Sequence, residues 1–338
     1  MSKVTIVVPT YNVEAYIEKC LDSLVDQTCN DYEILVINDG SKANEQPIID
    51  RFVAKYPIVK SIVKENGGYG SVLNKALEVI STPYMMICDP DDYLYPHTVE
   101  TLLKLMERND VDMVIGAKTL VYSDNDEQVY DASYNTKKFN IDDERVYNQT
   151  HEGFSNFFFI DPSPHAKLYK TDTIANIKFP TKVSFTDNVL YFLALAKCRK
   201  VLFTRQPLAY YLIDRVGNTV TDVKLGVIKA HTIVFTAILD QVATYNNVPE
   251  VFYYRIFEGY KFIINDKLAK VKADKADLKT ALDELYTVIE KLMPNKKYVL
   301  KYYRKYNDYL LFDQIKDHML FTKTFSKLVY AYIIKKKI

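Results

Sequence analysis

The run Asp89-Pro90-Asp91-Asp92 places three carboxylates within four residues of the chain. Carboxylates this close together repel one another, so the run costs stability unless a cation neutralises it. Their oxygens are hard ligands of the kind that Mg²⁺ and Mn²⁺ prefer, and a diphosphate could complete the coordination of such an ion. The run therefore predicts a divalent-metal site, although by itself it also fits a turn in which Asp caps the following helix.

Three further polar motifs lie where other predicted strands end. Buried strands are expected from four apolar runs, at residues 4–9, 33–39, 59–64 and 84–88. The polar motifs at the ends of the first three are Thr10-Tyr11-Asn12, Asp39 and Asn66-Gly67-Gly68. Ligands of such sheets bind beyond the carboxyl ends of the strands, so all four motifs are expected at one rim of the sheet.

Helical patterns separate these strands. Helices are expected over about 12–27, 44–56, 70–80 and 96–108, and Asn12 is the expected N-cap of the first. Further strands are expected at 113–122, 201–203 and 209–213. Strands that alternate with helices indicate an α/β, Rossmann-like fold, in which helices flank a mostly parallel central sheet. From about residue 225 the pattern is helical.

The composition is typical of a globular protein, since 48% of the 338 residues are apolar and 26% are charged. The four cysteines lack metal-binding spacing and are expected to stay reduced. No apolar stretch approaches the ~20 residues of a membrane span, and the N-terminus does not resemble a secretory signal. The expected location is therefore the cytoplasm, and no nucleic-acid partner is expected.

Positive charge is concentrated in the last third of the chain. From His231 onward there are 19 Lys and Arg residues against 12 Asp and Glu residues, although the net charge of the whole chain is +1. This region favours an anionic partner, such as a membrane surface or a phosphate-bearing acceptor, but also fits a solvated helical surface. Residues 325–338 could form a basic amphipathic helix on the inner face of a membrane, or pack on the protein or on a second subunit of a homo-oligomer.

Two classes of nucleotide-binding enzyme are disfavoured because their motifs are missing. No GxGxxG follows the first strand, as dehydrogenases require, and no GxxxxGK[ST] is present, as P-loop kinases require. What the chain carries instead is similar to the ordered motif set of the family 2 inverting glycosyltransferases, which have the GT-A fold. The matching segments are Val7-Val8-Pro9-Thr10-Tyr11-Asn12, Ile37-Asn38-Asp39-Gly40-Ser41, Glu65-Asn66-Gly67-Gly68 and Asp89-Pro90-Asp91-Asp92.

The resemblance implies a division of the chain into domains. A GT-A catalytic domain would span residues 1–224, with a nucleotide-sugar-binding half at 1–125 and an acceptor-side half at 126–224. A helical C-terminal region, 225–338, would follow. The likeness is strong over 1–125, continues more weakly to about 219, and ends at about 225.

The resemblance also assigns donor-side roles. Asp39 would accept a hydrogen bond from the imide N–H of uracil or thymine, since an ionised carboxylate is acceptor-only. Asp91 would be the principal metal ligand. Asp89 would contact the ribose or sugar and share the metal, while Asp92 would only support them. Further donor contacts are implied for Pro9, Thr10, Tyr11, Asn12, Asn66, Gly67 and, at the diphosphate, Arg215.

On the acceptor side, the resemblance implies that Asp187 is the general base that deprotonates the attacking hydroxyl. The family usually has Glu before this Asp, whereas this chain has Thr186, so the neighbouring acceptor contact must differ. Asp187 also fits a simple helix-capping role. His165 and Lys167 lie in a segment that resembles the acceptor side of the family site.

These features together predict an inverting glycosyltransferase. It would move a sugar from a nucleoside-diphosphate sugar, most specifically a UDP-sugar, to a hydroxyl of a glycan or lipid-linked glycan, with Mg²⁺ or Mn²⁺ on the diphosphate. One alternative is a sugar-1-phosphate nucleotidyltransferase, although the chain lacks the Gly-rich basic loop such enzymes need after the first strand. The other is a catalytically dead protein that binds a nucleotide-sugar or acts as a scaffold.

Overall fold

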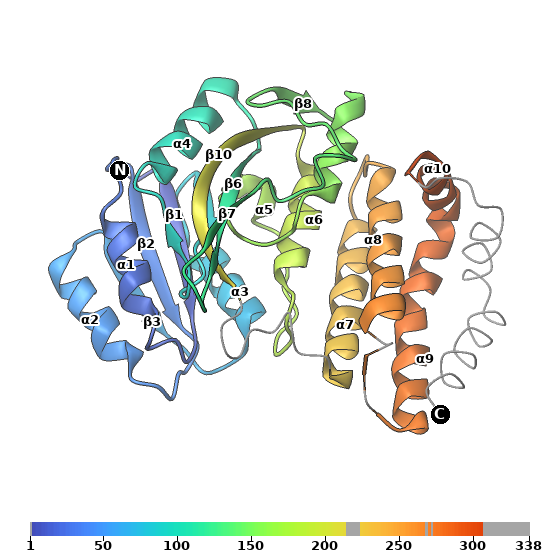
Figure 1. Cartoon of the computed structure of the whole chain (residues 1–338), viewed down its shortest axis with the longest axis horizontal. Helices are drawn as coiled ribbons and strands as arrows, with labels where there is room; N and C mark the ends of the chain where they lie inside the picture. Colours follow the sequence, from blue (N-terminus) through green and yellow to red (C-terminus); the bar gives the residue numbers. More distant parts are fainter. Residues whose placement is uncertain (1, 214–223, 268–269, 272, 307–338) are drawn as a thin grey trace. The chain divides into compact units, whose positions relative to one another are not determined.

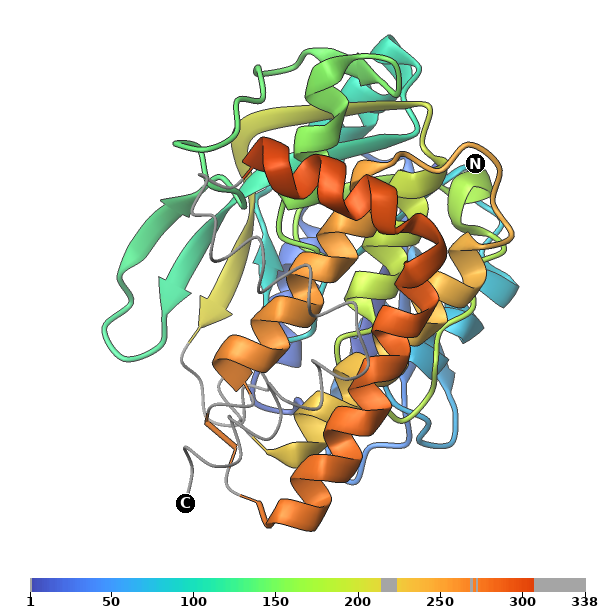
Figure 2. The same cartoon turned by 90° about the vertical axis from the view of Figure 1, so that its right-hand side faces the viewer.

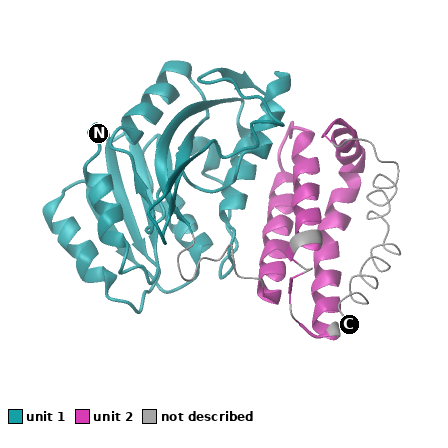
Figure 3. Cartoon of the chain, in the orientation of Figure 1, with its two compact units in different colours: residues 1–218 teal, residues 219–338 magenta. Residues whose placement is uncertain are grey.

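The computed structural model describes residues 2–213, 224–267, 270–271 and 273–306 (Figure 1). The chain divides into two compact units, residues 1–218 and 219–338, which are coloured separately in Figure 3. The first unit carries the sheet, and the second is helical.

Four parallel strands form one side of the sheet in the first unit. Their order is β3 (Val59–Val63), β2 (Tyr32–Asn38), β1 (Val4–Thr10) and β4 (Tyr84–Ile87). β1 is buried along its whole length, as expected for a parallel strand covered on both faces. Thr10 pairs with Asn38, and Asn38 with Val63, so these strands end at the same level. Their carboxyl ends form the single rim that the sequence predicted.

Beyond β4 the sheet is mixed rather than mostly parallel. β9 (Lys167–Lys170) lies between β4 and β6 (Met113–Tyr122) and is antiparallel to both. β10 (Lys200–Ile213) runs parallel to β6, with register shifts on either side of Pro207. A proline lacks the N–H that a ladder requires, so the two short strands expected here are two parts of one irregular strand.

Three short strands complete the sheet. They are β5 (Tyr93–Leu94) and β8 (Val146–Asn148), both antiparallel to β10, and β7 (Gln128–Asp131), antiparallel to β6. β5 follows the acidic run directly, which ties both ends of the acidic loop to the sheet.

Helices cover both faces of the parallel strands (Figure 1). On one face, α1 (Ile17–Val25), α2 (Glu45–Lys55) and α4 (Thr98–Asn109) share a single apolar cluster with alternate residues of β1, such as Ile6 and Val8. On the other face, α3 (Tyr69–Val79) packs against β1 and β2. The rim is thus set between two helical layers.

The segment between β6 and β10 carries the helix whose first residue is the predicted base, Asp187. It contains the 3-10 helix η1 (Glu152–Phe159), the short α5 (Thr171–Ile174) and α6 (Asp187–Lys197). Eight consecutive residues of α6, Val189–Ala196, are buried. Such a helix is held rigidly, so its first residue, Asp187, has a fixed position.

The second unit contains α7 (Leu225–Val242), α8 (Val251–Phe262), α9 (Lys275–Leu292) and α10 (Lys296–Tyr306), which are drawn in yellow to red in Figure 2. A π-helical turn, η2 (Ile263–Lys267), continues α8, and a 3-10 turn, η3 (Met293–Asn295), precedes α10.

Contrary to the sequence expectation, α7 is long and apolar enough to cross a membrane, judged by length and composition alone. However, 44% of its 18 residues are buried and it packs against α9, which is also the pattern of an ordinary core helix.

Candidate active site

The acidic loop between β4 and β5 is anchored through Asp92. This carboxylate is buried, and its Oδ1 accepts the backbone N–H of Leu212 at 2.7 Å. Its Oδ2 lies 2.6 Å from Nε2 of His165, which comes from the turn before β9. Asp92 therefore ties the acidic loop to β10 and to the acceptor-side segment, which fits the supporting role expected for it.

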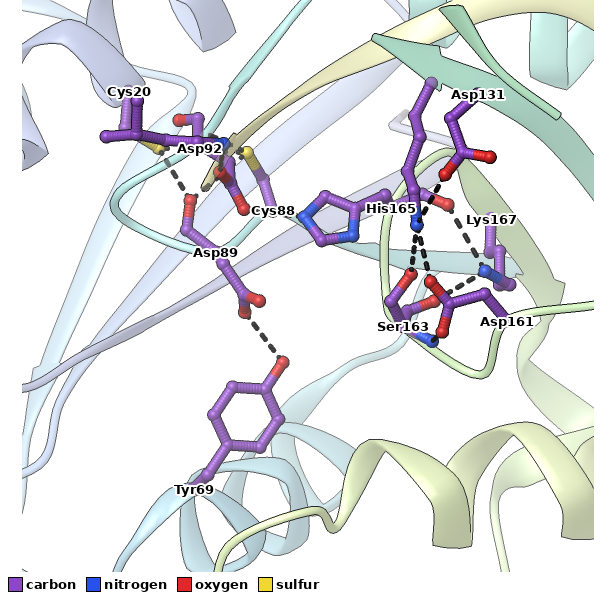
Figure 4. Close-up of polar contacts among 12 residues, drawn as sticks. Cys20, Tyr69, Cys88, Asp89, Asp92, Asp131, Asp161, Ser163, His165 and Lys167 are labelled. Atoms are coloured by element: carbon purple, nitrogen blue, oxygen red, sulfur yellow. Dashed lines mark hydrogen bonds and ion pairs between the residues drawn. The ribbon is translucent and has the colours of Figure 1, made fainter. Parts of the chain in front are cut away.

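Asp89 faces away from this anchor, toward α3 (Figure 4). The hydroxyl of Tyr69, the first residue of α3, donates to Asp89 Oδ1 at 2.8 Å. Burial, together with the charges of Asp92 and Asp91, raises the pKa of Asp89 to about 7. A bound cation would reverse this effect, because it stabilises the ionised carboxylate.

Two buried thiols contact the backbone of the acidic loop. Cys20 of α1 and Cys88, directly before the loop, are buried with their sulfurs 3.8 Å apart. Both thiols lie 3.6 Å from the carbonyl oxygen of Asp89 and can donate to it. All four cysteines of the chain are free.

The donor set at this loop fits a divalent cation. Among the described residues, Asp89, Asp92 and His165 form a group whose potential ligand atoms all lie within 4.8 Å of one another. Nδ1 of His165 is buried without a hydrogen-bond partner in the described part of the chain, which is a costly arrangement for a polar atom. Asp91, the ligand expected from sequence, is half-buried and is not a member of this group, so its metal role stays a prediction.

Asp39 lies beneath the loop that follows β3. Its side chain is 3% exposed and forms an ion pair with Lys64, whose Nζ lies 2.6 Å from Oδ1. The carboxylate also accepts the backbone N–H groups of Gly67 at 3.0 Å and Gly68 at 2.7 Å. Gly68 has φ +79°, a conformation that favours glycine. Asp39 thus orders the 66–68 loop, and a nucleobase that approached it would have to share the carboxylate with Lys64.

The last residues of β1 are buried, whereas the residue that follows the strand is exposed. Pro9 and Thr10 are buried, and the Thr10 hydroxyl donates to the carbonyl of Ile37 at 3.0 Å. Tyr11 is 44% exposed, so its ring is free to meet a ligand at the rim. The donor contacts expected from Tyr11, and from Asn66 across the rim, stay predictions.

The N-cap role expected for Asn12 is wrong, since α1 begins only at Ile17. Asn12 instead has φ +54°, and its Oδ1 accepts the backbone N–H groups of Lys42 at 3.1 Å and Ala43 at 3.3 Å. Asn12 therefore joins the loop after β1 to the loop after β2. Local sequence patterns do not reveal a contact of this kind, because it links distant segments of the chain.

The segment that leads into α6 is fixed to the same rim. The side chain of Asn74 in α3 exchanges two hydrogen bonds with the backbone of Phe179, at 2.9 and 3.0 Å. Gly70 lies against the carbonyl of Pro180, so even a methyl group there would collide with it. These contacts set residues 179–186 against the start of α3.

Asp187, the predicted base, is the first residue of α6 and is half-buried. Burial, with the charge of Asp161, raises its pKa to about 6. Burial raises the pKa of the Tyr69 phenol, and the charges of Asp89 and Asp187 raise it further. Tyr69 therefore bonds to the acidic loop through Asp89 and is also influenced by the charge of the predicted base.

Two buried lysines are close enough to affect the charge of His165, and Figure 4 labels one of them, Lys167. Lys118 of β6 is 1% exposed and pairs with Asp161 at 2.6 Å. Lys167 donates to the carbonyls of Ser163 at 2.5 Å and His165 at 3.5 Å. Burial lowers the pKa of Lys167 to about 7. Burial alone would raise the pKa of Asp161, but the two lysines hold it below its usual value.

His165 is electrically neutral in this setting. Burial lowers the pKa of its imidazole to about 3, and the charge of Lys118 lowers it further. His165 and Lys167 thus lie at the site as expected, but buried, and a direct acceptor contact for either stays a prediction.

Sequence reasoning missed Tyr69, Lys64 and Lys118. Tyr69 follows the Gly-Gly turn directly, and that position was the available signal. Lys118 gave none, because a lysine inside an apolar strand is recognisable only once its partner Asp161 is placed. Arg215, expected at the diphosphate, lies outside the described residues, as does the 325–338 tail.

Comparison with known proteins identifies the family. The model of glycosyl transferase family 2 matches residues 5–170. Glycosyltransferase GlyA of Streptococcus pneumoniae is 30% identical over 219 residues, which cover 63% of this chain but only 31% of GlyA. An uncharacterized glycosyltransferase of Mycoplasma pneumoniae, the MG060 homolog, is 32% identical over 225 residues, which cover 65% of this chain and 71% of that protein.

A solved structure shares the fold. S. aureus TarS 1–349, in a crystal structure with UDP-GlcNAc, superposes with a TM-score of 0.74 at 17% identity, covering 99% of this chain and 91% of that one. The expected fold, an α/β sheet of GT-A type with a helical C-terminal region, is confirmed. The chain therefore belongs to glycosyl transferase family 2, as its four rim motifs indicated.

Proposed function

We propose that this member of glycosyl transferase family 2 transfers a sugar, with inversion, from a UDP-sugar to a hydroxyl of a glycan or lipid-linked glycan. The observation that supports this most is the Tyr69 phenol, which donates to Asp89 of the acidic loop and whose pKa is raised by burial and by the charges of both Asp89 and Asp187. A half-buried carboxylate whose pKa is raised to about 6 is ionised at neutral pH, yet basic enough to take a proton.

The proposed reaction is a single displacement. As the acceptor oxygen forms its bond to the anomeric carbon, its proton passes to Asp187, and the bond between that carbon and the diphosphate oxygen breaks. The new bond forms on the face opposite the leaving diphosphate, so the configuration inverts. A divalent ion, when bound, would neutralise charge on the departing diphosphate.

The choice of a uridine donor is supported by residues at the carboxyl-end rim of the sheet. Tyr11 offers an exposed ring against which a base can stack, and Asp39 offers a carboxylate for an imide N–H. The structural neighbour TarS was solved with UDP-GlcNAc, which supports a uridine donor. The particular sugar is left to experiment.

The decisive experiment measures nucleotide release with Mn²⁺ from a panel of UDP-sugars, using wild type and Asp91→Asn. Release of UDP that depends on Asp91 supports the proposal. Formation of pyrophosphate from UTP and a sugar 1-phosphate would instead identify a nucleotidyltransferase. UDP binding without turnover of any donor, in the presence of simple glycan acceptors, would indicate a binding or scaffold protein.

We further propose a cytoplasmic protein that attaches peripherally to anionic membrane through its basic C-terminal region. α10 has no acidic residue, and Lys297, Lys301 and Lys305 each lie over the ring of the tyrosine that follows, at 4.7, 5.5 and 5.5 Å. Flotation with anionic and zwitterionic vesicles tests this. Equal partitioning of wild type and a chain without residues 325–338 would show that the tail makes no contribution.

A further inference from the structure

A buried carboxylate bonds to both of the loops that carry the predicted base-binding residues. Glu45 is the first residue of α2, and its relative exposure is 0%. Its Oε1 accepts the hydroxyl of Ser41 and, at 3.4 Å, the backbone N–H of Val13. Ser41 belongs to the loop after β2 and Val13 to the loop after β1, so this one carboxylate oxygen joins the two loops.

Asn12 adds three more bonds between the same loops. Its backbone N–H donates to Oγ of Ser41 at 2.9 Å, and its Oδ1 accepts the backbone N–H groups of Lys42 and Ala43. Oγ of Ser41 thus accepts from Asn12 while it donates to Glu45, which makes this hydroxyl the link between the buried carboxylate and the chain after β1.

These bonds lie next to the two residues that the proposed function assigns to the nucleobase. Tyr11, whose ring is 44% exposed, directly precedes Asn12. Asp39, whose side chain is 3% exposed, lies two positions before Ser41. The bonds between the loops therefore limit how far the backbone of Tyr11 and the backbone of Asp39 can move relative to each other.

Support of its own helix does not explain the position of the Glu45 side chain. An acidic residue in the first turn of a helix is favourable even when it is exposed to water. Burial removes water from this carboxylate, and Oε2 has no hydrogen-bond partner in the described part of the chain, which is unfavourable. The gain that offsets this cost must come from the bonds that Oε1 makes to Ser41 and Val13.

We infer that Glu45 is a positioning residue for the donor base, because it holds the loop of Tyr11 against the loop of Asp39. This rests on the proposed function, in which Tyr11 stacks on uracil and Asp39 accepts its imide N–H. Loss of the Glu45 carboxylate should weaken binding of the base and leave binding of the diphosphate unchanged. The preference for uracil over cytosine, which has no imide N–H, should fall as well.

The test compares ligands with and without the base. Affinities of the full-length protein for UDP, CDP and inorganic pyrophosphate, each with Mn²⁺, are measured by calorimetry for wild type, Glu45→Met and Glu45→Gln. Methionine fills the space but offers only a weakly accepting sulfur, so Glu45→Met should bind UDP roughly tenfold more weakly and pyrophosphate like wild type. Glutamine keeps a carbonyl oxygen for the two bonds, so Glu45→Gln should stay within about threefold of wild type for UDP. Glu78→Met, at a 64% exposed side chain on α3, is the matched control and should bind all three like wild type.

Unchanged UDP affinity in Glu45→Met would overturn the inference, and so would an equal loss for UDP and pyrophosphate, which would indicate general damage to the site. If Glu45→Met does not fold, Ser41→Ala removes the linking hydroxyl and should weaken binding of UDP, but not of pyrophosphate, by about threefold. A wild type that bound CDP more tightly than UDP would contradict the proposed donor alone, and the loss in Glu45→Met would then be measured with CDP. Selective UDP binding that Glu45→Met and Ser41→Ala both retained would contradict this inference alone.

Discussion

The backbone N–H of Lys182 donates to the carbonyl oxygen of Gly67 at 2.7 Å. This bond joins the segment that precedes the predicted base to the loop that follows β3. With the two bonds between the Asn74 side chain and the backbone of Phe179, it fixes the segment before Asp187 to the donor rim. Base and donor site should therefore keep their separation as substrates enter and leave.

Replacing Asp187 by Asn should abolish most transfer. Removal of a positioned general base typically costs about 10²- to 10⁴-fold in rate, and asparagine cannot take up the proton. Nucleotide release with a saturating acceptor measures the loss, while UDP binding should be retained. Asp172→Asn, an exposed acid in the first turn of α5, is the control and should be fully active. Unchanged turnover in Asp187→Asn would mean that Asp187 is only a helix-opening residue.

The pH dependence of transfer should report the same carboxylate. Burial raises the pKa of Asp187 to about 6, so below that pH the base is protonated and inactive. We expect kcat/KM to be level above pH 7 and to fall about tenfold per unit below pH 6. The residual activity of Asp187→Asn should lack this acid limb. A limb that persisted unchanged in the variant would assign it to another group.

Tyr69→Phe should weaken catalysis without unfolding the protein. The change removes only the hydroxyl that donates to Asp89 at 2.8 Å and leaves the ring to fill its space. A hydrogen bond to a charged group contributes about 1.5–3 kcal/mol, so a loss of roughly tenfold or more in kcat/KM for the donor is expected. Tyr130→Phe, at a 51% exposed position, is the matched control. If both variants matched wild type, Tyr69 would have no positioning role.

Asp39→Asn should affect stability as well as donor binding. Its carboxylate accepts the backbone of Gly67 and Gly68 and pairs with Lys64, and an amide cannot replace all these bonds. Removing one partner of such a buried pair costs about 3 kcal/mol. Urea unfolding should show this loss, whereas Asp50→Asn, an exposed acid on α2, should unfold like wild type. Weaker UDP binding with unchanged stability would instead favour a purely base-reading role.

Local patterns explain why the donor half was predictable. β1 to β4 are short apolar runs between helical patterns, and each is followed by a polar motif, so their shared rim follows from parallel topology alone. The same logic placed Asp39 and Asp89 at that rim. It failed at Asn12, because a side chain that bonds two loops depends on how those loops meet.

The acceptor half could not be predicted to the same depth, because its contacts join distant residues. Asp92 and His165 are 73 positions apart, and Lys118 and Asp161 are 43 apart. β9 inserts antiparallel between β4 and β6, although its sequence offers only four residues of pattern. Short strands of this kind are decided by the neighbours they find, not by their own composition.

Lys167→Met should change how stability depends on pH. Burial lowers the pKa of this amine from 10.5 to about 7, so between pH 7 and 10 the unfolded chain holds a proton that the folded chain has released. Stability contributed by this group therefore rises with pH across that window, and the methionine variant should lose that rise. Urea unfolding of both proteins at pH 7, 8 and 9 measures the difference, with Lys137→Met on an exposed turn to control for a lost positive charge. Parallel pH profiles for wild type and Lys167→Met would show that Lys167 is protonated in the folded protein and is held as a cation by Asp161 and its neighbours.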